Sequence, residues 1–142
     1  MEARDAGDAM GGDEAMIVAG LGFRHGVSAD EIVDAIEQAA QRQGVEMRHL
    51  RKLATVAARS QEPGLLEAAG RLGLIVEAID PQRLSEQRSQ LSTHSTRVLS
   101  LYGVGSVCEA AALAAAGDGA RLTTPRVATS RATCALAEGS GP

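Results

Sequence analysis

The sequence predicts an α/β fold, a three-layer α/β/α sandwich around a mostly parallel five-stranded sheet with an antiparallel edge hairpin. Short apolar runs alternate three times with segments of helical periodicity, which is typical of strand–helix–strand units. Two late apolar runs then follow, and too few residues separate them for a crossover helix, so they should pair antiparallel. Capping residues and glycines mark the ends of the helical segments.

The first strand and the first helix have the clearest boundaries. Residues 16–21 form a short apolar run followed by glycine, as expected for a buried strand. A helix is expected over residues 28–43, where apolar side chains recur on one face. Ser28 and Glu31 have the spacing of a capping box, and Gly44 supplies the C-terminal stop.

The central elements are two further strands and two further helices. Pro63 and Pro81 each stand at the first turn of a helix, where the missing N–H has no intrahelical partner to lose. Asp80 is an N-cap for the second of these helices. The expected strands cover residues 53–57 and 74–79, and the expected helices cover residues 63–72 and 80–88.

The C-terminal part begins with residues 89–104, the least regular internal stretch, which is expected to be a functional or mobile loop. Ser106 and Glu109 have the spacing of a second capping box, which starts a helix that runs to Ala116. The two late strands are expected over residues 120–124 and 132–137.

Both ends of the chain lack a helical or strand pattern. Residues 1–14 are expected to be a disordered acidic leader, and their five acids against Arg4 account for the net charge of -4. Residues 139–142 are expected to be a flexible tail. Residues 15–138 are therefore expected to form a single domain with a balanced charge.

Composition argues against several classes of function. Phe23 and Tyr102 are the only aromatic residues, whereas single-strand nucleic-acid binders use several rings to stack bases. The net negative charge also argues against a nucleic-acid partner. No apolar run is long enough to span a membrane, and no signal peptide is recognisable. Cys108 and Cys134 have no metal-ligand spacing, and two buried thiols fit the reducing cytoplasm.

Small residues and arginines gather where the predicted parallel strands end. Residues 20–28 follow the first strand, residues 58–62 follow the second, and residues 102–106 precede the fourth helix. Ligands of parallel α/β sheets bind at this edge, and helix N-termini with arginines attract anions. The pattern favours an anion-binding edge. The alternative, that the glycines make tight turns and the arginines are solvated, stays open.

The glycine-rich segment does not match a nucleotide-binding fingerprint. His25 stands where G-x-G-x-x-G requires its third glycine. No lysine precedes Ser28, so the segment is not a phosphate-binding loop of the G-x-x-x-x-G-K-[ST] type. We therefore expect no nucleotide, and no other cofactor is indicated.

Candidates for catalysis are few. His25 and Glu62 are the only plausible general bases at the predicted edge, and a surface turn histidine is the alternative for His25. Cys108 lies one turn into a helix beside a carboxylate, which favours a packed core thiol over a nucleophile. His49 and His94 are scattered, and no metal site is expected. Whether His25 or His94 contacts a ligand stays open.

Four sequence blocks, in order, resemble the CobE/CbiG C-terminal family of cobalamin biosynthesis. The first block, GLGFRHGVS, is similar to the family's G-x-G-x-R-x-G-[ST]-S opening, and GVGSVCEAAAL is similar to its G-x-x-S-V-x-E-A-A-A-L block. Ala57 and Arg59 stand where CbiG proteins often have Asp and Lys. The blocks are residues 20–28, residues 53–56 with 62–65, residues 103–113, and residues 124–126 with 132–137.

The resemblance implies a role in building the corrin ring. Full-length CbiG opens a ring-A lactone of a cobalt-precorrin and releases acetaldehyde. This chain resembles only the C-terminal part, which favours the stand-alone CobE type, so the hydrolase activity is not transferred to it. The ligand implied is a precorrin or a hydrogenobyrinic-acid-like tetrapyrrole, whose acetate and propionate groups suit arginines and helix N-termini.

The resemblance and the predicted edge together define a set of ligand-binding candidates. Residues 89–104 are a candidate to close over a flat macrocycle. The expected function is a carrier or accessory factor; a small hydrolase and a non-catalytic partner of a pathway methyltransferase or other pathway enzyme are the alternatives. The ligand-binding candidates are Gly22, Arg24, His25, Gly26, Ser28, Arg59, Gly103, Gly105, Ser106, Arg126, Thr129 and Ser130.

Overall fold

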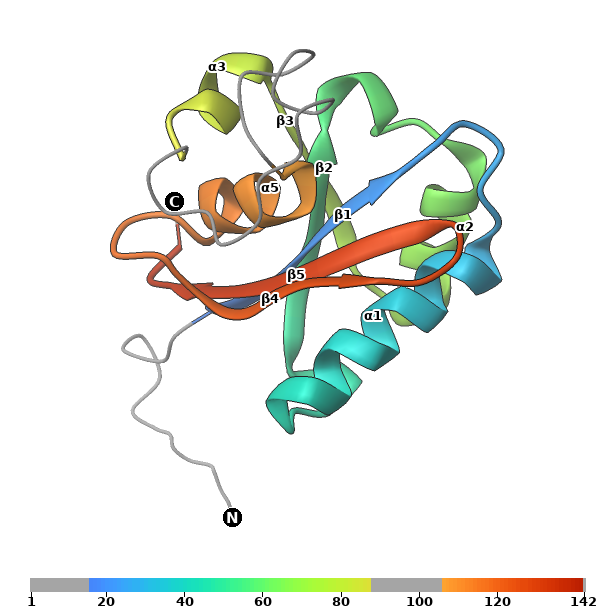
Figure 1. Cartoon of the computed structure of the whole chain (residues 1–142), viewed down its shortest axis with the longest axis horizontal. Helices are drawn as coiled ribbons and strands as arrows, with labels where there is room; N and C mark the ends of the chain where they lie inside the picture. Colours follow the sequence, from blue (N-terminus) through green and yellow to red (C-terminus); the bar gives the residue numbers. More distant parts are fainter. Residues whose placement is uncertain (1–15, 88–105, 142) are drawn as a thin grey trace.

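The computed structural model describes residues 16–87 and 106–141, which form an α/β fold with one five-stranded sheet (Figure 1). The strand order is β3-β2-β1-β5-β4. The strands are β1 (Met16–Phe23), β2 (Leu50–Val56), β3 (Ile75–Ile79), β4 (Arg121–Ala128) and β5 (Ala132–Gly139). The helices are α1 (Ala29–Gln43), α2 (Pro63–Leu72), α3 (Pro81–Ser85) and α5 (Val107–Ala116), with short 3-10 turns η2 (Met47–His49) and η3 (Ala57–Arg59).

The sheet is mixed, which corrects the expectation of a mostly parallel sheet. Strand β1 pairs with β2, and β2 with β3, in parallel. Strand β5 pairs antiparallel with both β1 and β4. The late hairpin lies at one edge as expected. Its second strand inserts beside β1, however, so the hairpin adds two antiparallel pairs to the two parallel ones.

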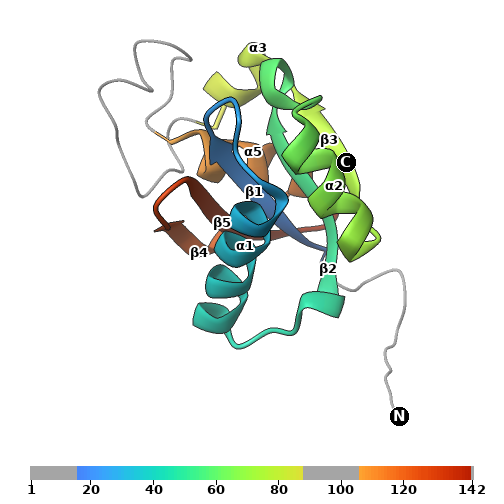
Figure 2. The same cartoon turned by 90° about the vertical axis from the view of Figure 1, so that its right-hand side faces the viewer.

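Helices cover both faces of the sheet. On one face α1 and α2 pack together and bury Ile32, Ile36 and Leu65 against the sheet (Figure 2). On the other face the Ala-rich α5 packs against β1, β2 and β5, and α3 buries Leu84 beside it. A Cβ at Gly20 would overlap the carbonyl oxygen of Cys108, so the close approach of α5 to β1 requires glycine there.

Local capping signals place most of the helix ends. Ser28 and Glu31 form the expected capping box of α1, and Gly44 ends that helix with φ 78°. In α5 only half of the expected box is present. The Ser106 hydroxyl accepts the N–H of Glu109 at 3.4 Å, but the Glu109 carboxylate accepts a hydrogen bond from another part of the chain. Within the described residues α3 is shorter than the helix expected over residues 80–88.

Two segments near the C-terminus differ from expectation. Strand β4 continues through Pro125 to Ala128, because register shifts between Thr124 and Val127 accommodate a residue that has no N–H to donate. Of the residues expected to form a flexible tail, Gly139 ends β5, and the N–H of Ser140 donates to Asp118 O after α5 at 3.3 Å. The N–H of Gly141 donates to Ala116 O at 2.8 Å. The expected leader, residues 1–14, lies outside the described residues.

Candidate functional site

A pocket of about 740 Å³ opens at the edge of the sheet where β1 and β2 end. Strand β5 begins and α5 starts at the same edge, so four elements meet there. We call it the arginine pocket. Its lining residues are Gly22, Phe23, Arg24, His25, Thr55, Val56, Arg59, Ser106, Val107, Arg126, Thr129, Ser130, Arg131, Ala132 and Thr133.

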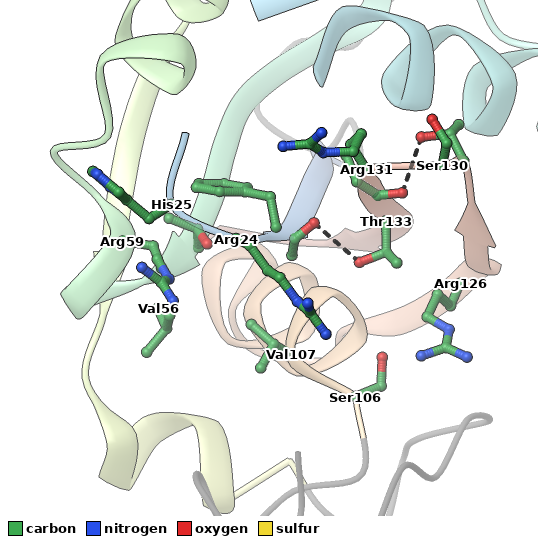
Figure 3. A pocket seen from close by; sticks show the side chains of 15 residues that line it. Arg24, His25, Val56, Arg59, Ser106, Val107, Arg126, Ser130, Arg131 and Thr133 are labelled. Atoms are coloured by element: carbon green, nitrogen blue, oxygen red, sulfur yellow. Dashed lines mark hydrogen bonds between the residues drawn. The ribbon is translucent and has the colours of Figure 1, made fainter. Parts of the chain in front are cut away.

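Four arginines from separate segments line the pocket. Arg24 follows β1, Arg59 ends the turn η3 after β2, and Arg126 belongs to β4. Arg131 lies in the turn between β4 and β5. Figure 3 shows the Arg24 guanidinium directed toward the start of α5, with Arg59, Arg126 and Arg131 placed around it. Residues distant in sequence therefore present positive charge to one cavity.

Three of the four lining arginines, Arg24, Arg59 and Arg126, form no ion pair with a described residue. None of the lining residues is acidic. Among the described residues, Arg131 is the lining arginine that has an ion pair, and its Nε lies 3.9 Å from Glu31 Oε2. Like charges that share a concave surface raise its potential and attract anions. The arginines therefore give this cavity a positive potential.

Apolar side chains and hydroxyls complete the lining. Phe23, Val56, Val107 and Ala132 give the pocket an apolar part beside its charges. Three threonine hydroxyls donate their protons to backbone carbonyls. Their oxygens can therefore accept a hydrogen bond from a ligand but cannot donate one. The bonds are Thr55 to Leu21 O at 2.8 Å, Thr129 to Ala132 O at 3.1 Å and Thr133 to Gly22 O at 3.3 Å.

His25 and Glu62 form a pair at the rim. Glu62 precedes α2, and its carboxylate accepts the N–H of Gly26 at 2.8 Å and bonds the Nδ1 of His25 at 3.0 Å. The N–H of Gly26 is the main cause that holds the pKa of Glu62 below its usual value, and His25 adds to it. The Glu62 side chain is 7% exposed and the His25 side chain 83%. A buried carboxylate thus orients an exposed imidazole and leaves Nε2 for other contacts.

The structure brings most of the sequence-predicted candidates together. Eight of them line the pocket: Gly22, Arg24, His25, Arg59, Ser106, Arg126, Thr129 and Ser130. Gly26 and Ser28 lie beside it: Gly26 makes the turn after β1 with φ 90°, and Ser28 caps α1. Gly103, Gly105 and His94 lie outside the described residues.

Several lining residues were missed from the sequence. Thr55 and Val56 end a buried strand, and nothing in their residue type distinguishes them from other core positions. Arg131 carried a usable signal, because it lies in the turn of the late hairpin next to two predicted candidates. Phe23 was available as an aromatic residue inside the first block.

The cysteines of the described chain are not part of the arginine pocket. Burial raises the pKa of the Cys108 thiol, and raises that of Cys134 further, so both are core thiols in the ordinary pH range. No group of three or more His, Cys, Asp or Glu side chains in the described ranges could hold a metal ion. No helix within those ranges is long and apolar enough to cross a membrane.

Fold and pocket together define an α/β domain with an arginine-lined pocket at the carboxyl edge of β1 and β2. The family model described as cobalamin synthesis G C-terminus matches residues 17–137. The protein CobE from Sinorhizobium sp is 34% identical over 121 residues, which are 85% of this chain and 79% of that protein. The chain therefore belongs to the CobE/CbiG C-terminal family and is a cobalamin biosynthesis protein.

Solved structures share this fold. A crystal structure of CobE, a protein from the cobalamin (vitamin B12) biosynthetic pathway, aligns with a TM-score of 0.81 and 33% identity, covering 87% of this chain and 90% of that one. The cobalamin biosynthesis protein chiG from Agrobacterium tumefaciens aligns with a TM-score of 0.70 and 41% identity, covering 88% and 99%. A putative cobalamin biosynthesis protein G homolog from Sulfolobus solfataricus shares the fold at 20% identity, with a TM-score of 0.68, 87% of this chain and 37% of that one.

Proposed function

We propose that the protein binds a polycarboxylated tetrapyrrole, a precorrin or a hydrogenobyrinic-acid-like intermediate, and acts as a carrier or accessory factor. The observation that carries this proposal is a pocket whose described lining residues include four arginines and no acid. Arginine pairs with carboxylates through two parallel hydrogen bonds, so four arginines suit a ligand with several acetate and propionate groups.

Size and polarity of the pocket also support a ring ligand over a small inorganic anion. The cavity of about 740 Å³ falls within the roughly 300–1,000 Å³ typical of small-molecule sites. Phe23 and Val107 offer apolar surface for the face of a macrocycle, while the arginines meet its carboxylate-bearing rim. A phosphate or sulfate ion would leave that apolar surface unused.

A titration with hydrogenobyrinic acid tests the proposal. We expect saturable binding, seen as a change in the corrin absorbance and as co-elution on gel filtration. Arg24→Ala should weaken binding about tenfold or more, because it removes a charge-assisted contact. Arg51→Ala is the matched control, since Arg51 is an exposed arginine of β2 outside the pocket. An unchanged spectrum and separate elution of protein and corrinoid would contradict the proposal.

A second candidate function is hydrolysis of a precorrin, and the His25–Glu62 pair favours it. A carboxylate bonded to Nδ1 fixes the imidazole so that Nε2 can take up a proton, the arrangement that general bases use. Incubation with a ring-A lactone precursor and an assay for acetaldehyde separate the two functions. Hydrolysis predicts release of acetaldehyde that His25→Ala abolishes. Tight binding without acetaldehyde supports the carrier.

The compartment proposed for this function is the cytoplasm. Both cysteines of the described chain are free and buried, a state that suits a reducing environment.

A further inference from the structure

Glu109 is a fully buried carboxylate that neither function uses. It lies in the first turn of α5 with 0% of its surface exposed, and it does not line the arginine pocket. Its Oε2 accepts the backbone N–H of Arg126 at 2.9 Å. An acceptor buried to this degree requires hydrogen-bond partners, and the Arg126 N–H is one of them.

The partner of this carboxylate sits at an irregularity of β4. The register with β5 runs from Thr124 opposite Leu136 to Val127 opposite Cys134, so Pro125 and Arg126 together face the one residue between these partners, as in a β-bulge. Pro125 has no N–H, and the N–H of Arg126 turns to Glu109. Such irregularities re-aim a side chain, and they are frequent beside functional sites.

We propose that Glu109 is a positioning residue, which holds the backbone at Arg126 so that the guanidinium faces the arginine pocket. The Arg126 side chain is exposed and has no ion pair with any described residue, so its backbone anchor defines where the charge lies. Figure 3 shows Arg126 projecting from β4 near Ser106, which begins α5. The inference rests on the proposed function, because Arg126 is assigned there to a ligand carboxylate.

Two substitutions distinguish a positioning role of Glu109 from the alternative that Glu109 acts only through its negative charge. Glu109→Gln keeps the length and an acceptor oxygen but removes the charge. Glu109→Asp keeps the charge but shortens the side chain by one methylene, which withdraws the acceptor from the Arg126 N–H. Positioning predicts that the Gln variant binds hydrogenobyrinic acid within about twofold of wild type and that the Asp variant binds about threefold or more weakly. Charge balance predicts the reverse order.

The same two substitutions, Glu109→Gln and Glu109→Asp, are then made in the Arg126→Ala variant. If Glu109 acts through Arg126, the Asp variant should lose its effect there, whereas a general structural defect would persist. Glu138→Gln and Glu138→Asp are matched controls, since Glu138 pairs with Arg121 on the same two strands outside the pocket. Neither control should change the affinity. Equal weakening by Glu109→Asp with and without Arg126 would overturn the proposal.

A measurement without ligand distinguishes failure of this proposal from failure of the proposed function. Amide hydrogen exchange at Arg126 should be slow in wild type and in Glu109→Gln, and faster on the order of tenfold in Glu109→Asp. If wild type does not bind hydrogenobyrinic acid, the proposed function fails. The exchange rates still show whether Glu109 holds the Arg126 N–H. Unchanged protection of the Arg126 amide in the Asp variant would show that Glu109 does not hold it.

Discussion

Two groups of basic side chains near the same sheet differ in whether their charges are paired with carboxylates. Lys52, Glu77 and Arg83, which we call the Glu77 cluster, form a compensated set: Lys52 Nζ lies 2.6 Å from one oxygen of Glu77 and Arg83 Nη1 lies 3.0 Å from the other. Arg83 also donates to Ala114 O of α5 at 3.1 Å. In the arginine pocket, by contrast, Arg24 has no ion pair with any described residue.

The difference separates charges that hold the fold from charges that face a ligand. The Glu77 cluster joins β2, β3, α3 and α5, and burial of Lys52 at 7% exposure is possible because its charge is matched. Within the described part of the chain, Arg24 and Arg126 have no ion pair that offsets the repulsion among the pocket arginines. An anion that enters the pocket would offset this repulsion.

The largest expected effect breaks the Glu77 cluster. Glu77→Ala leaves Lys52 buried without its carboxylate, and loss of one partner of a fully buried pair costs about 3–5 kcal/mol. Because Glu77 is 22% exposed, we expect about 2–3 kcal/mol less free energy of unfolding, measured by urea denaturation. Binding of hydrogenobyrinic acid by the remaining folded protein should be unchanged. If Glu77→Ala lost affinity for hydrogenobyrinic acid but kept its stability, the Glu77 cluster could not be distinguished from the arginine pocket as a group that serves the fold.

Salt should affect the arginine pocket more than the Glu77 cluster. Raising the salt concentration from 50 to 500 mM should weaken ligand binding roughly tenfold, because exposed arginines are screened. The free energy of unfolding should change little, since the cluster is partly buried and screened less. Titrations and urea denaturation at both salt concentrations check this prediction. Affinity that does not depend on salt would argue for a ligand held by apolar contacts alone.

Acid should affect the Glu77 cluster in a defined direction. Burial alone would raise the pKa of Glu77, but hydrogen bonds and charges from Lys52 and Arg83 outweigh it and lower the pKa below the ordinary 4.5. The stabilisation is therefore complete above pH 4.5 and is lost as the pH falls through the lower value of the folded protein. Wild type should exceed Glu77→Gln in stability at neutral pH, and the difference should shrink in acid. A difference that grows toward low pH would contradict this sign.

The smallest expected effect concerns Arg131, which lines the arginine pocket and also forms an ion pair with Glu31. Its ion pair with Glu31 is long and partly exposed, so it is weak. Glu31→Gln keeps the capping box of α1 but releases Arg131 to the pocket. We expect affinity for the corrinoid to rise by about twofold, with a slightly lower melting temperature because the N-terminus of α1 loses a favourable charge. Weaker binding in this variant would show that Glu31 holds Arg131 in place for the ligand.

The elements that the sequence predicted well are those with local causes. The capping box at Ser28 and the stop at Gly44 act within one helical turn, so α1 was bounded to within a residue. The shared edge of β1 and β2 follows from their parallel pairing, which brought Arg24 and Arg59 together correctly. Glu109 was mistaken for a local capping partner, because its acceptor role depends on Arg126, 17 residues away.

The sequence by itself determined the order of strands and helices, the apolar faces that they bury and the predominance of arginine at one edge. These features depend on neighbours within a few positions, so periodicity and capping reveal them. Only the tertiary structure decided that β5 inserts beside β1, that β4 shifts register at Pro125, and that Lys52 meets Glu77 across 25 residues. Strand register sets these contacts, and one step of register sends a side chain to the opposite face of the sheet.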